Sequence, residues 1–294
     1  MEINTKEYAN LWKKELKESI IELNSKPTLV IIIAEDFYKP SSIYVANKRR
    51  LATELGIETK LIKIQGWENK TKDDLLTEIR EIIDSHEGCS IICQLPFPQL
   101  TENEIAELIP VKFDVDGFTN YQKGLLVSGS KKALVPCTAL GVIKLLKYIH
   151  GDLTGKSIAI VSRSNLIGKP LIQLALQNNM TPTIVHTKTY EEEMLNTLQS
   201  KSIIVTGCGQ RKIFNCGQFH FGYVQTIIDC SMDKVDGIAG VGDCDKEDIL
   251  ENLPHINIAS GYGHTGIMTV LGLCDNVIKA HKLFLNSDTE NMKQ

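Results

Sequence analysis

The first candidates for chemistry are a tyrosine and a lysine near the start of the chain. Tyr44 and Lys48 follow the apolar run 28–34 and are four residues apart in a segment that we expect to be helical. Residues at this spacing lie on one face of a helix, so a phenol ring and an ammonium group can contact one ligand together. The ring can stack on a flat substrate and the lysine can move a proton. The alternative is an exposed, solvated helix face without a ligand.

Two further groups of polar residues lie after or between apolar segments. Gln94 directly follows the short apolar strand 90–93, and open α/β sheets bind ligands beyond the carboxyl ends of their strands. Asp114 and Asp116 form an acidic turn, and an ionised carboxylate can accept paired hydrogen bonds from an amino-heterocycle. Alternatively, Gln94 belongs to a proline-rich turn that ends the strand, and both aspartates only form a turn.

A dinucleotide site is expected where the apolar strand 157–161 turns into a helix ending near Asn178. This turn contains Arg163 and one glycine, Gly168, so the Gly-x-Gly-x-x-Gly pattern is missing there. The next strand, 183–185, is not followed by the acidic residue that would bind the ribose of NAD. Arg163 is therefore a candidate to bind the 2′-phosphate of NADP; the alternative is an ordinary surface arginine.

A literal Gly-x-Gly-x-x-Gly does occur at 261–266, before a final helix from Ile267 to about Phe284. Only that helix and a polar tail follow, so the βαβ unit that gives the motif its meaning cannot form. We therefore do not interpret 261–266 as a dinucleotide site. The Tyr44-x-x-x-Lys48 pattern also suggests short-chain dehydrogenases, but there the pair follows the nucleotide-binding half, and here it precedes it.

Apolar strand-like segments alternate with helical ones, which favours mostly parallel α/β sheets. The expected helices are 6–23, a helix that carries Tyr44 and Lys48 and ends before Gly56, 71–85, 102–108 and 139–150, the last with Thr138 as N-cap. The expected strands are 28–34, 57–64, 90–93, 157–161, 183–185, 202–206, 226–229 and 256–259. A break between domains is expected at 152–155.

Composition limits the class of protein. The chain has 294 residues, of which 43% are hydrophobic and 23% charged, enough for two domains with their own cores. A net charge of −4 argues against nucleic acid or an anionic membrane as partner. No signal-like segment and no long apolar run is present, so we expect a cytoplasmic protein without membrane contact. The eight cysteines form no C-x-x-C pair, which predicts reduced thiols and no zinc site.

In order and spacing, these segments resemble the bifunctional methylenetetrahydrofolate dehydrogenase/cyclohydrolases from about residue 3 to 285. The resemblance depends on several ordered motifs, which are more specific together than any one alone. They are Ser41-x-x-Tyr44-Val45-x-x-Lys48, Gln94-Leu95-Pro96-x-Pro98, Asp114-Val115-Asp116-Gly117-Phe118, Pro136-Cys137-Thr138, Arg163-Ser164-x-x-x-Gly168-Lys169-Pro170 and His186.

The resemblance implies an α/β protein of two domains with a cleft between them. A three-layer α/β catalytic domain would comprise 1–138 and 267–294, and a Rossmann-type dinucleotide-binding domain would comprise 139–266. Such enzymes oxidise 5,10-methylenetetrahydrofolate to the methenyl cation and hydrolyse that cation to 10-formyltetrahydrofolate, in one-carbon metabolism and purine biosynthesis. The implied cofactor is NADP, with NAD as the alternative, and no metal is needed. The implied partners are tetrahydrofolate derivatives and a second copy of the chain in a homodimer.

The resemblance also assigns roles to residues. Lys48 would move the proton of the attacking water, Gln94 would orient Lys48, Tyr44 would stack on the folate, and Asp116 would bind the pterin. Gly263 would lie near the substrate. The implied cofactor-binding residues are Ser162, Arg163, Ser164, His186 and Thr187.

The departures from the family pattern are concentrated on the cofactor side. Ser162 stands where the family has glycine, and Ala139 where it has proline. In the loop 259–269, Gly263 remains from a glycine pair and His264 replaces the other. Two alternatives therefore stay open: a cyclohydrolase-only enzyme, and a non-catalytic regulatory protein that binds folate or nucleotide. The retention of Lys48 argues against the second alternative.

Overall fold

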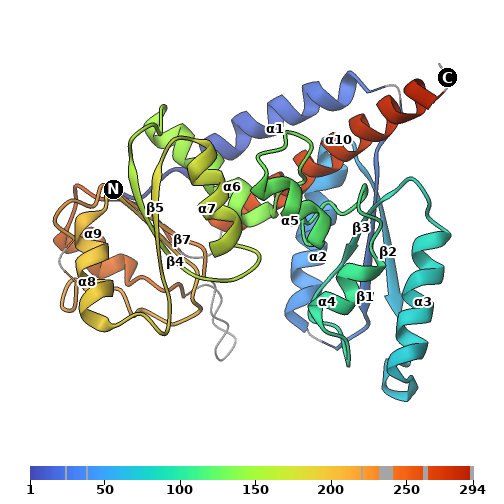
Figure 1. Cartoon of the computed structure of the whole chain (residues 1–294), viewed down its shortest axis with the longest axis horizontal. Coiled ribbons are helices and arrows are strands. Elements are labelled where there is room, and N and C mark those ends of the chain that lie inside the picture. The colour runs from blue at the N-terminus through green and yellow to red at the C-terminus, as the bar shows by residue number, and fades with distance from the viewer. Residues whose placement is uncertain (24, 38, 220, 232–240, 261–263, 292–294) are drawn as a thin grey trace. The chain divides into compact units, whose positions relative to one another are not determined.

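The structure is a computed structural model that describes residues 1–294 except 24, 38, 220, 232–240, 261–263 and 292–294; for 39–41 and 284–291 it describes the backbone alone. The chain forms two compact units, one containing 1–11 and 136–272 and the other containing 12–135 and the chain from Leu273 on (Figure 1). Each unit is built on one parallel β-sheet. The predicted α/β fold class is confirmed.

The sheet of the unit that contains 12–135 has three strands in the order β2-β1-β3. Its elements are β1 (Thr28–Ala34), α2 (Lys39–Leu55), β2 (Glu58–Ile64), the 3-10 helix η1 (Trp67–Asn69), α3 (Lys72–Asp84), β3 (Ser90–Cys93), α4 (Glu102–Leu108) and α5 (Asn120–Val127). The central strand β1 is buried from Leu29 on, whereas the edge strand β2 is half-exposed, as its alternating sequence predicts. The connections to β2 and to β3 run in opposite directions, so right-handed crossovers place α2 and α3 on opposite faces of the sheet (Figure 1).

The sheet of the unit that contains 136–272 has five strands in the order β5-β4-β6-β7-β8. Its elements are α6 (Cys137–His150), β4 (Ser157–Val161), α7 (Gly168–Gln177), β5 (Thr181–Val185), α8 (Glu191–Ser200), β6 (Ile203–Thr206), β7 (Thr226–Asp229), α9 (Lys246–Asn252) and β8 (Asn257–Ala259). The chain leaves β4 for β5 on one side and returns to β6 on the other. The boundary between β4 and β6 is therefore a topological switch point, where open α/β sheets bind ligands.

The first residues of the chain extend this second sheet beyond β8. The Ile3 N–H donates to the Ile258 carbonyl over 2.9 Å, and the Ile258 N–H donates to the Met1 carbonyl over 2.9 Å. Glu2 forms a parallel bridge with Ile258. The edge of β8 is therefore covered by residues 1–3.

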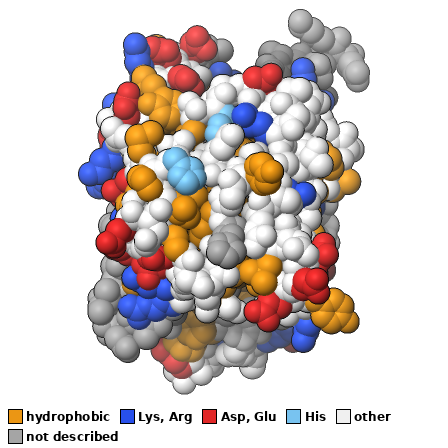
Figure 2. Space-filling view, turned by 90° about the vertical axis from the view of Figure 1, so that its left-hand side faces the viewer, with side chains coloured by type: hydrophobic (Ala, Val, Ile, Leu, Met, Phe, Trp, Pro, Cys, Tyr) orange, Lys and Arg blue, Asp and Glu red, His pale blue; other side chains and the backbone are white. Residues whose placement is uncertain are grey.

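Two helices, α1 (Thr5–Ile21) and α10 (Thr265–Asn291), contribute residues to both units. None of the helices in the described part of the chain combines the length and the apolar character needed to cross a bilayer. On the face seen in Figure 2, acidic and basic side chains are interspersed around uncharged and apolar ones, so one sign of charge does not dominate there.

The helix starts show where local sequence was sufficient and where it was not. Thr71 caps α3 through a capping box with Asp74, and Gly56 follows α2 with a φ of 99°, as its place after the helix predicts. The prediction that Thr138 is an N-cap is wrong. The N-cap of α6 is Pro136, because its ψ of 124° is not helical and the helix starts at Cys137. The helices α5, α8 and α9 were not predicted.

Candidate functional site

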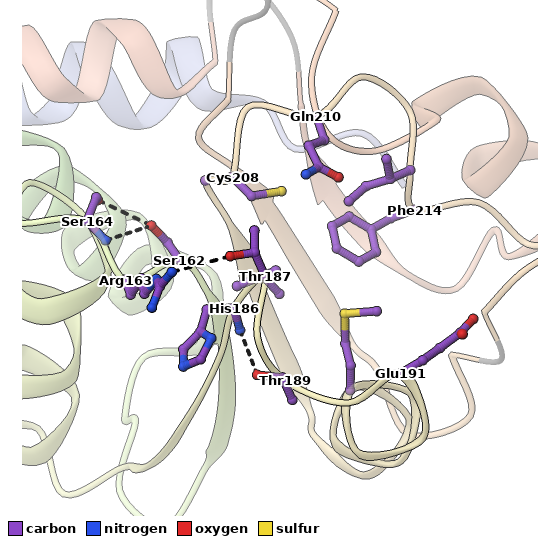
Figure 3. Close-up of a pocket in the computed structure, with 14 residues that line it drawn as sticks. Ser162, Arg163, Ser164, His186, Thr187, Thr189, Glu191, Cys208, Gln210 and Phe214 are labelled. Atoms are coloured by element: carbon purple, nitrogen blue, oxygen red, sulfur yellow. Dashed lines mark hydrogen bonds between the residues drawn. The ribbon is translucent and has the colours of Figure 1, made fainter.

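A cavity of about 630 Å³ lies beyond the carboxyl ends of β4, β5 and β6 (Figure 3). Ser162 follows β4, His186 follows β5 and Gly207 follows β6, and all three line it. All five predicted cofactor-binding residues line the same cavity: Ser162, Arg163, Ser164, His186 and Thr187. The strand ends of the sheet thus bring together residues that are more than twenty positions apart in the sequence.

Hydroxyl groups hold the turn from β4 into α7. The Ser162 hydroxyl donates to Ser164 Oγ over 3.2 Å and accepts from the Ser164 N–H over 3.4 Å. Ser164 Oγ in turn accepts from the Ile167 N–H over 3.1 Å. Ser162 is buried, so its side chain is a part of the turn itself. The Ser164 side chain lies on the rim of the cavity, near the start of a helix whose N-terminus favours phosphate groups.

The single glycine of this turn is required by a close backbone approach. A Cβ atom on Gly168 would lie 2.0 Å from the Ser162 carbonyl oxygen and 2.9 Å from the Arg163 nitrogen. Any side chain at 168 would therefore displace the backbone of the turn. The glycine serves helix-to-strand packing, although the Gly-x-Gly-x-x-Gly pattern is missing.

Arg163, between the two serines of this turn, contributes a positive charge to the cavity. Arg163 is exposed, and its Nη2 donates to Thr187 Oγ1 over 3.4 Å. The His186 N–H donates to Thr189 Oγ1 over 2.9 Å, which fixes the segment after β5. A guanidinium beside a hydroxyl at this strand end matches a phosphate-bearing ribose. Glu191, in the first turn of α8, also lines the cavity and was missed from the sequence.

The wall on the β6 side was not predicted either. It is formed by Cys208, Gln210 and Phe214, which face the Ser162 turn across the cavity (Figure 3). Burial and the nearby Asp243 carboxylate raise the pKa of the Cys208 thiol to about 12, so the thiol stays protonated and donates to that carboxylate. The signal in the sequence was a Gly-x-Gly directly after a strand, at Gly207 and Gly209, which the strand-end rule could have identified.

In the other unit, the structure brings Lys48 and Gln94 together. Lys48 is 8% exposed, and its Nζ donates to Gln94 Oε1 over 2.9 Å. Gln94 is itself fixed, because its N–H donates to the Ile32 carbonyl over 2.8 Å and its Nε2 to the Leu95 carbonyl over 3.0 Å. Tyr44, one helical turn before Lys48, is partly buried. An amide oxygen thus holds a buried ammonium group on α2, at the carboxyl end of β3.

The two aspartates of the acidic turn differ. Asp114 is fully buried, and its Oδ2 accepts from the Phe118 N–H over 2.8 Å and the Thr119 N–H over 2.7 Å. Burial raises the pKa of the Asp114 carboxyl against the lowering effect of these hydrogen bonds. Asp114 thus stabilises the turn and does not bind a ligand. Asp116 is partly exposed and is the carboxylate that a ligand can reach.

The Asp116 turn is attached to the strand that precedes Gln94. The Ile91 N–H of β3 donates to the Phe113 carbonyl over 2.9 Å. From α10, the Asn276 amide donates to the Val115 carbonyl over 2.8 Å. Lys48, Gln94 and the Asp116 turn therefore belong to one framework around the end of β3.

Three other predictions concern different parts of the chain. Gly263 lies outside the described residues. His264, which follows it, is held by Thr5 Oγ1 at 3.2 Å and Glu2 Oε1 at 3.1 Å. All eight cysteines are free thiols, and no group of three or more metal-ligating side chains gathers in the part of the chain that the structure describes.

The chain thus combines a parallel sheet that has a cavity at its switch point with a second α/β unit in which a buried lysine is held by a glutamine. These features define the class: a two-domain nucleotide-binding α/β protein. Two sequence profiles identify the family. The profile described as "Tetrahydrofolate dehydrogenase/cyclohydrolase, catalytic domain" matches residues 3–116, and the one described as the NAD(P)-binding domain of the same family matches residues 136–285. The chain belongs to the tetrahydrofolate dehydrogenase/cyclohydrolase family.

Individual relatives agree with the profiles. The bifunctional protein FolD of Rickettsia bellii (strain RML369-C) is 35% identical over 289 residues, covering 96% of this chain and 98% of the relative. FolD of Rickettsia massiliae (strain Mtu5) is 34% identical over 272 residues, covering 92% and 91%. The crystal structure of the bifunctional methylenetetrahydrofolate dehydrogenase/cyclohydrolase from Campylobacter jejuni superposes with a TM-score of 0.83 at 29% identity, covering 96% of this chain and 98% of that chain. The resemblance inferred from the motifs is confirmed, and the bifunctional enzyme is favoured over both alternatives.

Proposed function

We propose that the chain oxidises 5,10-methylenetetrahydrofolate to the 5,10-methenyl cation with NADP and hydrolyses that cation to 10-formyltetrahydrofolate. The observation that carries the proposal is the buried Lys48 ammonium held by Gln94 Oε1 at 2.9 Å, in a chain of this family. A buried ammonium group is costly in free energy, and a catalytic role explains its presence better than folding does.

In the hydrolysis, Lys48 Nζ is the group that moves protons. Water adds to the electrophilic carbon of the cation and loses one proton, which gives a neutral hydroxyl adduct. The bond from that carbon to N5 then breaks as N5 gains one proton and the hydroxyl of the adduct loses its own proton to solvent, which leaves the formyl group on N10 and one proton released overall. Lys48, in its neutral form, takes the first proton and returns the second. Gln94 keeps Nζ oriented, Tyr44 stacks on the folate rings and Asp116 accepts hydrogen bonds from the pterin amino edge.

The cavity of the other unit fits a dinucleotide. Its volume of about 630 Å³ is in the range of cofactor sites. Ser164 at the start of α7 would hold the pyrophosphate, with the buried Ser162 shaping the turn that it binds to, and Arg163 with Thr187 would hold the 2′-phosphate of NADP, with His186 nearby. When bound, NADP supplies the acceptor for the hydride. No acidic residue follows β5 directly, which supports NADP over NAD.

The finer assignments remain part of the proposal. We propose the domain limits 1–138 with 267–294 and 139–266, a substrate contact at Gly263, and a cytoplasmic homodimer that serves one-carbon metabolism and purine biosynthesis. Family membership supports the metabolic role, and the second profile begins at residue 136, close to the proposed limit at 138.

The test is absorbance on the purified protein: methenyl formation with NADP or NAD, and methenyl hydrolysis, each measured beside Lys48→Met. Lys63→Met is the matched control, since Lys63 lies in the same unit with an exposed ion pair to Glu35 at 2.9 Å. We expect both reactions in the wild type and a loss of about 10²-fold or more in hydrolysis for Lys48→Met alone. Hydrolysis without reduction of either nucleotide would support the cyclohydrolase-only alternative. If the folded protein shows activity in neither assay, the non-catalytic binding protein is the better account.

A further inference from the structure

The cavity wall on the β6 side is held by a buried carboxylate that has no assigned role. Asp243 is fully buried. Its Oδ2 accepts from the Cys208 N–H over 2.9 Å and from the Cys208 thiol over 3.2 Å, and its Oδ1 accepts from the Gln210 N–H over 2.7 Å. Both Cys208 and Gln210 line the cavity. The two oxygens of Asp243 thus fix the backbone of this wall at positions 208 and 210.

The residues on either side of Asp243, Gly242 and Cys244, both lie against Asp229 at the end of β7, and this fixes the position of Asp243. Asp229 Oδ2 accepts from the Cys244 N–H over 2.9 Å. A Cβ on Gly242 would lie 2.0 Å from the same oxygen, so the chain passes against Asp229 where only glycine fits. The position of Asp243 is therefore determined by the sheet and not by the ligand.

The order of the strands indicates which half of a dinucleotide meets this wall. A dinucleotide binds across the switch point, with its two halves on opposite sides of it. Arg163 and Thr187 lie on the side of β5, where the 2′-phosphate of the adenosine half is expected. Cys208 and Gln210 follow β6, on the other side of β4. The nicotinamide half consequently falls on the side of the wall that Asp243 holds.

We propose that Asp243 is a positioning residue for the nicotinamide half of NADP, which it serves by holding residues 208–210 in the place where that half binds. The inference rests on the proposed function and deepens it. Asp243 acts through the loop and touches neither cofactor nor substrate.

A carboxylate is needed at position 243 because both of its oxygens accept hydrogen bonds from the wall. In Asp243→Asn, one oxygen becomes an NH₂ group that faces a backbone N–H, so either the Cys208 or the Gln210 contact is lost. We expect the dissociation constant for NADP⁺ to rise about tenfold, the scale of one buried hydrogen bond. Adenosine 2′,5′-bisphosphate, the adenosine half of NADP, should bind within about twofold of the wild type because the Arg163 side is unchanged.

The experiment is titration calorimetry of the full chain with NADP⁺ and with adenosine 2′,5′-bisphosphate, with methenyl hydrolysis as the check for the folded protein. Asp248→Asn is the matched control: Asp248 accepts from the Cys216 N–H over 2.6 Å, but Cys216 does not line the cavity. Ser231→Ala is a milder variant of the same wall, because Ser231 Oγ accepts from the Gly209 N–H over 3.1 Å.

A selective loss of NADP⁺ affinity in Asp243→Asn, absent in Asp248→Asn, supports the inference. Equal weakening of both ligands, or of neither, overturns it. If Asp243→Asn does not fold, Ser231→Ala decides in the same way: a selective loss supports the inference, and wild-type affinities overturn it. If the wild type binds no NADP⁺, the proposal that NADP is the cofactor is wrong, and this inference is wrong with it. If the wild type and the variants all bind NADP⁺ normally, only the inference about Asp243 is wrong.

Discussion

Replacing Gly168 by alanine perturbs the cofactor cavity through the backbone alone. The added Cβ would lie 2.0 Å from the Ser162 carbonyl oxygen and 2.5 Å from its carbon, whereas real Cβ atoms essentially never come closer than 3.0 Å. The oxygen must therefore move by about 1 Å, the difference between the first and last of these distances. Ser162 directly follows β4, which pairs on both sides with β5 and β6, so the strand cannot yield freely.

Two magnitudes follow for Gly168→Ala. Overpacking of this kind costs about 1–3 kcal/mol in the free energy of unfolding. Displacement of the turn by about 1 Å misplaces Ser162, Arg163 and Ser164 together, and misplacements of this size reduce function by about 10²-fold. We therefore expect the dissociation constant for NADP to rise about 10- to 100-fold, which corresponds to about 1.4–2.7 kcal/mol of binding free energy.

The assay is titration calorimetry with NADP, combined with urea unfolding. Gly222→Ala is the control, because Gly222 lies in the same unit and a Cβ there would meet nothing within 4 Å. Methenyl hydrolysis should persist in both variants, since Lys48 and Gln94 belong to the other unit. Wild-type affinity and wild-type stability in Gly168→Ala would refute the steric argument.

Three further predictions concern stability and affinity. Asn276→Ala leaves two buried backbone carbonyls without their donor, so urea unfolding should show a loss of about 2–4 kcal/mol; an unchanged midpoint would contradict this. Burial lowers the pKa of His150, so its stabilising contribution is complete above the unfolded value of 6.5 and is lost as the pH falls through 6.5 towards the folded value. The free energy of unfolding of His150→Gln should therefore depend less steeply on pH than that of the wild type as the pH falls through 6.5, and equal slopes would contradict this prediction. Ser162→Gly frees the Ser164 N–H for a phosphate, and calorimetry should give about 2- to 10-fold tighter NADP binding, whereas weaker binding would contradict the reasoning.

The sheets could be predicted because their signals are local. The apolar runs Thr28–Ala34, Ser90–Cys93 and Ser157–Val161 are strands with the predicted bounds. The rule that ligands lie beyond strand ends then selected Gln94 and Arg163, and the structure places both at such ends. A short apolar run between turn residues identifies a buried strand without knowledge of its neighbours.

The wall of the cavity could not be predicted in the same way. Asp243 meets Cys208 across 35 positions of sequence, and no local pattern encodes that pairing. An aspartate in a Gly-Asp-Cys turn has the same local sequence pattern whether its side chain faces solvent or is buried and accepts three hydrogen bonds, as Asp243 does. The helices α8 and α9 were missed because they carry few apolar residues with helical spacing.

The departures from the family pattern follow a steric logic. Ser162 replaces a glycine, yet its backbone is not among those with positive φ, and its hydroxyl bonds to Ser164 within the turn. His264 also replaces a glycine, and its ring is bound by Thr5 and Glu2 from the first residues of the chain. Gly168 is retained, because a side chain there would strike the backbone at 2.0 Å. The chain has thus lost glycine where a side chain finds partners in its own unit and has kept it where none fits, so these substitutions are compatible with an intact cofactor site.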